Sequence, residues 1–191
     1  MERRLRNNGE RWDQLGLVQE ASDIDRQAIM REGKPPEFDH LVGWEFAGIN
    51  TGTLAAPVRK FIKGFYDGPS RGKGPEPFIQ GYNIPVRQDG VQKPHRAKPS
   101  ADRPKRFGFY RVYRPVSGVD QRYPNSIFLN YGLGGNPVVD PGSLLRDYVV
   151  QVYDDDPTLL LGHAFLALPF GARPSLSFFV LKRMHQHSFR G

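Results

Sequence analysis

Residues 41–52 read LVGWEFAGINTG, and the fold prediction starts from this stretch. Trp44 and Phe46 alternate with charged or small neighbours, which is the period of two that a half-buried β-strand shows. Gly48 and Gly52 follow, and glycines in a strand let it bend or let another backbone come close. One interpretation is an ordinary core strand with a large aromatic anchor. The interpretation we favour is the first strand of a closed barrel, in which Trp44 plugs one end and the glycines let the strand bend.

The period of two continues along the rest of the chain, in segments separated by turn residues. The 191 residues include 21 Gly and 17 Pro, a composition that suits many short strands better than long helices. No crossover helix fits between the segments, so the strands are predicted to be antiparallel and connected in sequence. Eight strands suit a small closed barrel, which leaves no exposed edge, and a β-sandwich is the alternative. The predicted strands are 41–49, 58–66, 78–86, 106–113, 126–131, 144–153, 159–168 and 176–184.

A helical arm is predicted ahead of the barrel domain, with residues 1–40 forming the arm and 41–191 the barrel. Apolar residues recur at helical spacing through most of the arm. Ser22 followed by Asp25 is a capping signature for a second helix, and Gly33 is its stop signal. We expect the arm to pack across the sheet, to close an opening of the barrel or to bind a partner.

Charge is distributed unevenly along the chain. The net charge is +7, but residues 59–114 hold 14 basic and 4 acidic residues, a surplus of 10. A basic block of this kind attracts nucleic acid, other polyanions or acidic ligands, unless it is simply a solvated surface. Within it, residues 87–105 lack periodicity and are rich in Pro, Lys and Arg, which predicts a mobile loop.

Missing residue types and motifs restrict the chemistry. The chain has no cysteine, which excludes disulfides, thiol catalysis and cysteine-ligated zinc. It also has no phosphate-binding loop, hydrolase or metalloprotease motif, so we expect no cofactor and no metal site, and we lean against an enzyme. The N-terminus lacks the apolar core of a secretory signal, and the longest apolar run is too short to cross a bilayer. We therefore expect a cytoplasmic protein without a transmembrane segment.

Gly43-Trp44 begins the first strand, after a helical lead and before seven more predicted antiparallel strands. This arrangement resembles the calycin superfamily, which contains the lipocalins and the fatty-acid-binding proteins. In that group a Gly-x-Trp motif begins the first strand, and a basic residue of the last strand often packs over the tryptophan. Here Gly and Trp are adjacent, and Lys182 or Arg183 would take the place of the basic residue. The resemblance implies a barrel that binds a small apolar or amphipathic molecule.

Four strands carry a polar residue on an otherwise apolar face, and these residues are Gln80, Arg111, Arg146 and His163. A buried unpaired charge is destabilising, and the planar guanidinium group suits a carboxylate partner. We therefore predict that Arg111 and Arg146 meet the acidic group of a ligand inside the barrel. The alternatives are that this face points outward, that an arginine extends to the rim, or that His163 is a hydrogen-bonded core residue. The predicted ligand-binding residues are Trp44, Gln80, Tyr82, Phe109, Arg111, Arg146, His163, Phe165 and Phe179.

These features favour non-catalytic binding of a small amphipathic or anionic molecule, such as a fatty acid, inside the barrel. The first alternative is binding of nucleic acid or another polyanion through residues 59–114. The segment KRFGFYRVYRP, residues 105–115, interleaves basic and aromatic residues as single-strand-binding proteins do, which requires its rings to be exposed. The second alternative is a structural subunit, whose helical arm and basic loop dock onto a protein partner in a larger assembly.

Overall fold

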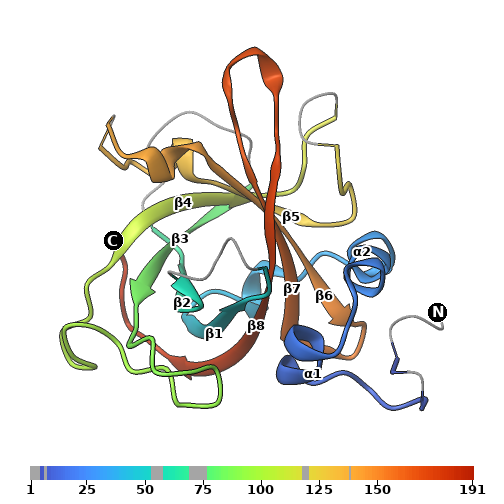
Figure 1. Ribbon diagram of the computed structural model, residues 1–191. Coiled ribbons are helices and arrows are strands. Elements are labelled where there is room, and N and C mark those ends of the chain that lie inside the picture. Colours follow the sequence, from blue (N-terminus) through green and yellow to red (C-terminus); the bar gives the residue numbers. More distant parts are fainter. Residues whose placement is uncertain (1–4, 7, 53–57, 69–76, 118–120, 138) are drawn as a thin grey trace.

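Eight antiparallel strands close into a barrel (Figure 1). The computed structural model describes residues 5–6, 8–52, 58–68, 77–117, 121–137 and 139–191. The strands are β1 (Trp44–Asn50), β2 (Lys60–Tyr66), β3 (Phe78–Pro85), β4 (Phe107–Tyr113), β5 (Ile127–Asn130), β6 (Leu145–Tyr153), β7 (Asp156–Leu166) and β8 (Ser175–Gln186). Each strand pairs with the next, and β8 pairs back with β1. This closure confirms the predicted eight-stranded barrel and excludes the sandwich.

Two short helices, α1 (Gln14–Gln19) and α2 (Asp23–Glu32), precede the barrel. Ser22 caps α2 as the sequence predicts, because its hydroxyl accepts from the Asp25 N–H while the Asp25 carboxylate accepts from the Ser22 N–H. Single 3₁₀ turns occupy Phe38–His40, Tyr131–Leu133, Pro141–Leu144 and Pro169–Gly171. Across the described residues, no helix has both the length and the apolar composition that crossing a membrane requires.

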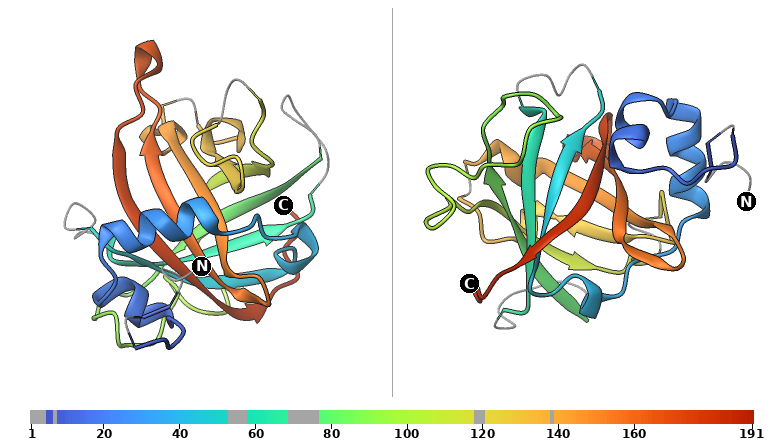
Figure 2. Two further views of the ribbon diagram at one scale, coloured as in Figure 1. Left: turned by 90° about the vertical axis from the view of Figure 1, so that its right-hand side faces the viewer. Right: turned by 90° about the horizontal axis from the view of Figure 1, so that it is seen from below.

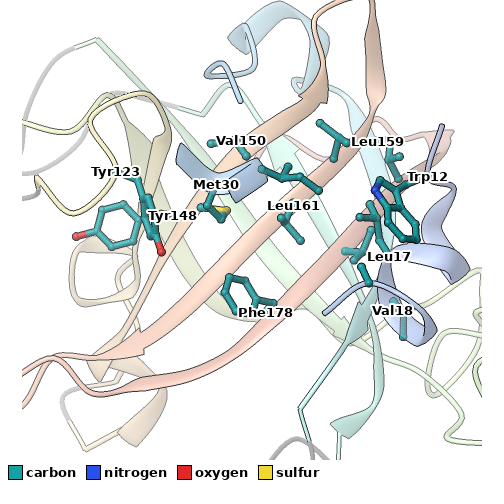
Figure 3. Close-up of a cluster of buried hydrophobic side chains, with 14 of the residues drawn as sticks. Trp12, Leu17, Val18, Met30, Tyr123, Tyr148, Val150, Leu159, Leu161 and Phe178 are labelled. Carbon is teal, nitrogen blue, oxygen red and sulfur yellow. The ribbon is translucent and has the colours of Figure 1, made fainter. Parts of the chain in front are cut away.

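The helices pack against the outer face of β6, β7 and β8 (Figures 1 and 2). Figure 3 shows the contact, in which Leu17 and Met30 of the helices meet Val150, Leu159 and Leu161 of the strands. All five side chains are at most 2% exposed. Because this outer face is covered, these three strands carry apolar side chains on both faces.

One half of the barrel interior is filled by side chains. Phe65 packs edge-on against Phe46 at 5.6 Å and against Tyr110 at 5.9 Å between ring centroids. Trp44, at the start of β1, is half-buried and packs against this interior cluster. The Trp44 end of the barrel is therefore packed with side chains, and any ligand space lies toward the other end.

A bulge in β4 changes which residues face the interior. Gly81 pairs with Tyr110, whereas Asn83 pairs with Phe107, so β4 has one residue more than β3 between these pairs. Gly108 in the bulge has a φ of +53°, a conformation that glycine adopts without steric strain. The bulge lets Phe107 and Tyr110 both face the interior.

Residues 87–105 lie against the barrel wall and are held there by a buried lysine. Lys60 Nζ donates to Asp89 Oδ1 at 2.6 Å and to the Lys93 carbonyl at 3.1 Å. His95 Nε2 also lies 3.0 Å from the Gly48 carbonyl. These contacts attach the first part of the loop to β1 and β2, while the mobility of the loop stays a prediction.

Candidate functional site

A cavity of about 410 Å³ lies in the half of the barrel away from Trp44. This volume is within the range of roughly 300–1,000 Å³ found for small-molecule pockets. The residues around it come from one end of the barrel, for example Asn50 at the end of β1 and Leu176 near the start of β8. Most of the wall is apolar, formed by Val58, Phe61, Phe107, Leu145, Ala164, Leu176 and Phe179. The polar wall residues are Asn50, Lys63, Asn83, Tyr131, Asp147 and Ser177.

Four of these polar residues form a hydrogen-bonded network around Lys63. The Lys63 Nζ atom lies 3.1 Å from Asp147 Oδ2, and the two side chains are only 3% and 4% exposed. The ammonium also donates to Asn83 Oδ1 at 3.1 Å and to the Tyr131 hydroxyl. Tyr131 in turn donates to Asp147 Oδ2 at 3.1 Å. Each of the three N–H groups of the ammonium therefore has an acceptor, which is how a buried cation is stabilised.

Aromatic rings surround the Lys63 amine. Its nitrogen lies 4.7 Å from the ring centroid of Tyr110, 5.1 Å from that of Tyr131 and 5.3 Å from that of Phe179. Burial lowers the pKa of Lys63, and the Asp147 carboxylate opposes this shift. Burial also raises the pKa of Tyr131 well above its ordinary value, so its hydroxyl keeps its proton.

The network offers hydrogen-bonding atoms to a molecule in the cavity. Lys63 and Tyr131 both contact Oδ2 of Asp147, so Oδ1 is the oxygen through which this carboxylate can accept a further hydrogen bond. The positive charge of Lys63 is already balanced by Asp147, so the site as a whole carries no net charge. Such an arrangement suits a polar, uncharged group better than a carboxylate.

Phe179 is the predicted ligand-binding residue that lines this cavity. Its ring lies over Gly162 on the neighbouring strand, where a Cβ atom would come within 2.1 Å of Phe179 Cζ. Trp44 lies at the opposite end of the barrel, and the Arg183 guanidinium carbon is 4.8 Å from its ring centroid. Lys182, the other candidate for that contact, donates to Thr158 instead.

The structure corrects the predicted inward orientation of Arg111 and Arg146. The Arg111 guanidinium lies 3.8 Å from the ring centroid of Phe78, and Arg146 donates to the carbonyls of Ser143 and Leu145. Both belong to the outer strand faces, because Arg146 alternates with the cavity residues of β6 and Arg111 with the interior residues of β4. Neither arginine is among the residues that line the cavity.

Gln80, Tyr82, Phe109 and Phe165 are also on the outside of the barrel wall. Tyr82 and Phe109 belong to an outer cluster on β2, β3 and β4, and the Tyr82 hydroxyl donates to Glu45 Oε1 at 2.7 Å. Gln80 accepts from Tyr66 of the same cluster at 3.2 Å. Phe165 belongs to the core beneath the helices. Their predicted placement inside the barrel is therefore wrong.

His163 lies on the outer face too, in a chain of hydrogen bonds. Its Nε2 is 2.7 Å from Ser175 Oγ, and its Nδ1 is 2.9 Å from the hydroxyl of Tyr123. Tyr123 donates its proton to Gln27, so it accepts from Nδ1–H, and Nε2 accepts from Ser175. Burial, assisted by the charge of Arg122, lowers the pKa of His163 to about 4. His163 is thus the hydrogen-bonded core histidine of the alternative interpretation.

The prediction missed Lys63, Asn83, Tyr131 and Asp147. Lys63 shows the signal that was applied to the arginines, since it is a charged residue between Phe61 and Phe65 on one strand face. Asp147 alternates with Tyr148, Val150 and Val152, so the sequence pattern places it on the face opposite to theirs and gives no sign that it lines the barrel interior. No local pattern shows that these two residues, from opposite sides of the barrel, form an ion pair.

Comparisons with protein-family models, with curated proteins and with solved structures found no match for this chain. Over the described part of the chain, no three histidine or acidic side chains are grouped so that they could hold a metal ion. The cavity is therefore the feature of this structure that bears most directly on function.

Proposed function

We propose that the barrel binds a small amphipathic molecule without chemical change, with the apolar part of the ligand in the cavity and its polar end at the Lys63 network. The observation that carries this proposal is one compact polar network in the wall of an otherwise apolar cavity. Pockets for small molecules have this composition, because apolar walls supply affinity and a few polar groups supply orientation.

The polar end is proposed to be uncharged, such as a hydroxyl or a carbonyl group. A carboxylate would gain the attraction of Lys63 but would lie beside the Asp147 carboxylate, and two like charges at short distance are unfavourable. A hydroxyl group can donate to Asp147, and a carbonyl can accept from the Lys63 amine in place of Asn83 Oδ1, one of the three present acceptors of the amine. This narrows the range of amphipathic or anionic ligands that the sequence alone suggests.

The proposal extends to the calycin resemblance. The contact between Arg183 and Trp44 is the one that this resemblance implies, and it lies at the end of the barrel away from the cavity. A ligand space inside a closed barrel with a plugged end is also what the resemblance implies. These two features support a calycin-like carrier or sensor.

The test is displacement of an apolar fluorescent dye from the full chain by decanol and by decanoate, at a pH at which decanoate is ionised. We expect decanol to displace the dye at a concentration about tenfold lower, a difference of ~1.4 kcal/mol. Asp147→Asn removes the negative charge and should increase the affinity for decanoate relative to that for decanol. Arg111→Ala is the control, and we expect it to change the affinity for neither ligand because Arg111 lies on the outer face of the barrel. Stronger binding of decanoate that is lost in Arg111→Ala would contradict the proposal.

The second candidate function, binding of a polyanion, is supported by the loop 87–105. Its basic side chains Arg87, Lys93, Arg96, Lys98, Arg103 and Lys105 are all exposed. β4 offers no continuous stacking surface for a nucleic acid, because Tyr110 and Tyr113 are buried and Phe107, although 43% exposed, lines the cavity. This leaves a purely electrostatic contact, which would weaken steeply with salt when heparin or single-stranded DNA is titrated.

A further inference from the structure

We propose that Lys63 forms a covalent imine with ligands whose polar end is an aldehyde, and that Asp147 acts as the counter-ion of the resulting iminium. This inference rests on the proposed function, since it requires the ligand to enter the cavity. It goes further by naming the functional group that the site selects and the bond that forms.

The position of the amine supports a covalent bond. Lys63 is in the middle of β2, a strand that is hydrogen-bonded on both sides, and it lines the cavity together with Phe61 and Phe179. An aldehyde whose chain lies between these rings would bring its carbonyl carbon toward the Lys63 nitrogen. The bond would thus form at a mostly apolar cavity wall, on an amine whose side chain is only 3% exposed.

The neighbours of Lys63 supply the proton transfers. In the ion pair, one proton passes from the ammonium to Asp147, and the neutral nitrogen adds to the carbonyl carbon. The alkoxide takes a proton from the newly bonded nitrogen, which gives a neutral carbinolamine. Asp147 then returns its proton to the carbinolamine hydroxyl, which leaves as water, so that the iminium forms beside the Asp147 carboxylate. Tyr131, which contacts both partners, can relay the proton. In sum, an ammonium and an aldehyde give an iminium and water, without any change of oxidation state.

The product fits the site that the ammonium occupies. The iminium keeps the single positive charge, so Asp147 remains its ion-pair partner and the cation–π contacts with the surrounding rings are retained. Burial lowers the pKa of Lys63 and so increases the fraction of neutral amine available for addition. A lysine pKa lowered by desolvation is the usual way in which proteins activate this side chain toward carbonyl groups.

Lys60 provides an internal comparison. It lies three residues before Lys63 on β2, so its side chain is on the opposite face of the strand. Its amine is also buried, but it donates hydrogen bonds to Asp89 and to two loop carbonyls. Lys60 is not among the residues that line the cavity. Burial of a lysine on β2 is therefore common to both residues, whereas access to the cavity is specific to Lys63.

The experiment treats the full wild-type chain with one equivalent of decanal and cyanoborohydride, and locates the added decyl group by peptide mass spectrometry. We expect the group on Lys63, at a rate at least about tenfold above that of exposed lysines such as Lys93, because the cavity holds the aldehyde beside the Lys63 amine, whose pKa is lowered by burial. Lys60 should stay unmodified, and Lys63→Met should abolish the fast phase. The site of labelling is read from the wild type, so it does not depend on the variant folding.

Dye displacement by decanal and decanol, without the reducing agent, separates the two proposals. If both compounds displace the dye but Lys63 is labelled no faster than the exposed lysines, the imine is overturned and the non-covalent carrier remains. If neither displaces the dye, both proposals fail. Fast labelling that is equally strong in a folded Lys63→Met variant would also overturn the imine.

Discussion

At the scale of single residues, His163 shows how burial converts one titration into a dependence of stability on pH. The folded chain holds its imidazole neutral between Ser175 and Tyr123, and its pKa is about 4 rather than the ordinary 6.5. Between these two values the unfolded chain binds a proton that the folded chain does not. The free energy of unfolding therefore decreases as the pH falls through this window.

We expect the titration of His163 to lower the free energy of unfolding by up to ~3 kcal/mol between pH 6.5 and pH 4, since one unit of pKa corresponds to about 1.4 kcal/mol. The contribution is fully present above pH 6.5 and its loss is complete below pH 4. Urea unfolding at several pH values, in the wild type and in His163→Gln, measures it. The variant should be less stable at pH 7 and should lose less stability on acidification. Parallel curves for the two proteins would show that His163 is not held neutral.

At the scale of elements, the wall of the cavity depends on a ring that lies over a glycine. Phe179 of β8 covers Gly162 of β7, and a Cβ there would meet the ring at 2.1 Å. Gly162→Ala should push the ring into the cavity, lower the free energy of unfolding by about 1–3 kcal/mol and weaken ligand binding. Gly52→Ala is the control, because its Cβ would lie 3.5 Å from the nearest atom, an ordinary contact. Dye binding and urea unfolding of both variants test this, and equal behaviour would contradict it.

The strands themselves could be predicted from the sequence, because a local signal defines them. The alternation in 144–153 and 176–184 predicts β6 and β8 to within two residues at each end. Gly and Pro mark the turns, and the absence of crossover helices leaves sequential antiparallel pairing as the simple topology. Eight strands are enough for a small barrel, and closing the barrel removes the exposed sheet edges, so closure could be predicted as well.

The orientation of the strands could not be predicted in the same way, and this is why the site was missed. On β6, Tyr148 and Val150 face the helices, while Asp147 and Val149 face the barrel interior. Both faces are buried, so alternation does not distinguish the inside from the outside. On β4 the bulge at Gly108 shifts the alternation as well. The ion pair between Lys63 and Asp147 exists only once the sheet is closed, and no pattern along the chain shows it.

At the scale of the whole molecule, the helices and the barrel share one hydrophobic core. The core beneath the helices contains Ile29 and Met30 of α2 together with Val150, Leu161 and Val180 of the barrel, all of them fully buried. Its strands also form the interior wall around the cavity. Loss of the helices therefore exposes one face of the strands whose other face holds the ligand space, and we expect the chain to unfold as a single cooperative unit.

Two isoleucines on α2 provide a matched test of this cooperativity. Ile29 is fully buried, whereas Ile24 is 66% exposed. In a Trp12→Phe background the only tryptophan left is Trp44, at the far end of the barrel. Ile29→Ala should lower the free energy of unfolding reported by Trp44 by about 2–5 kcal/mol, because it leaves a cavity in the shared core. Ile24→Ala should change it by less than about 0.5 kcal/mol. If Ile29→Ala lowers the helical circular dichroism signal but leaves the Trp44 transition in place, then the arm unfolds independently and the barrel supports its cavity without it.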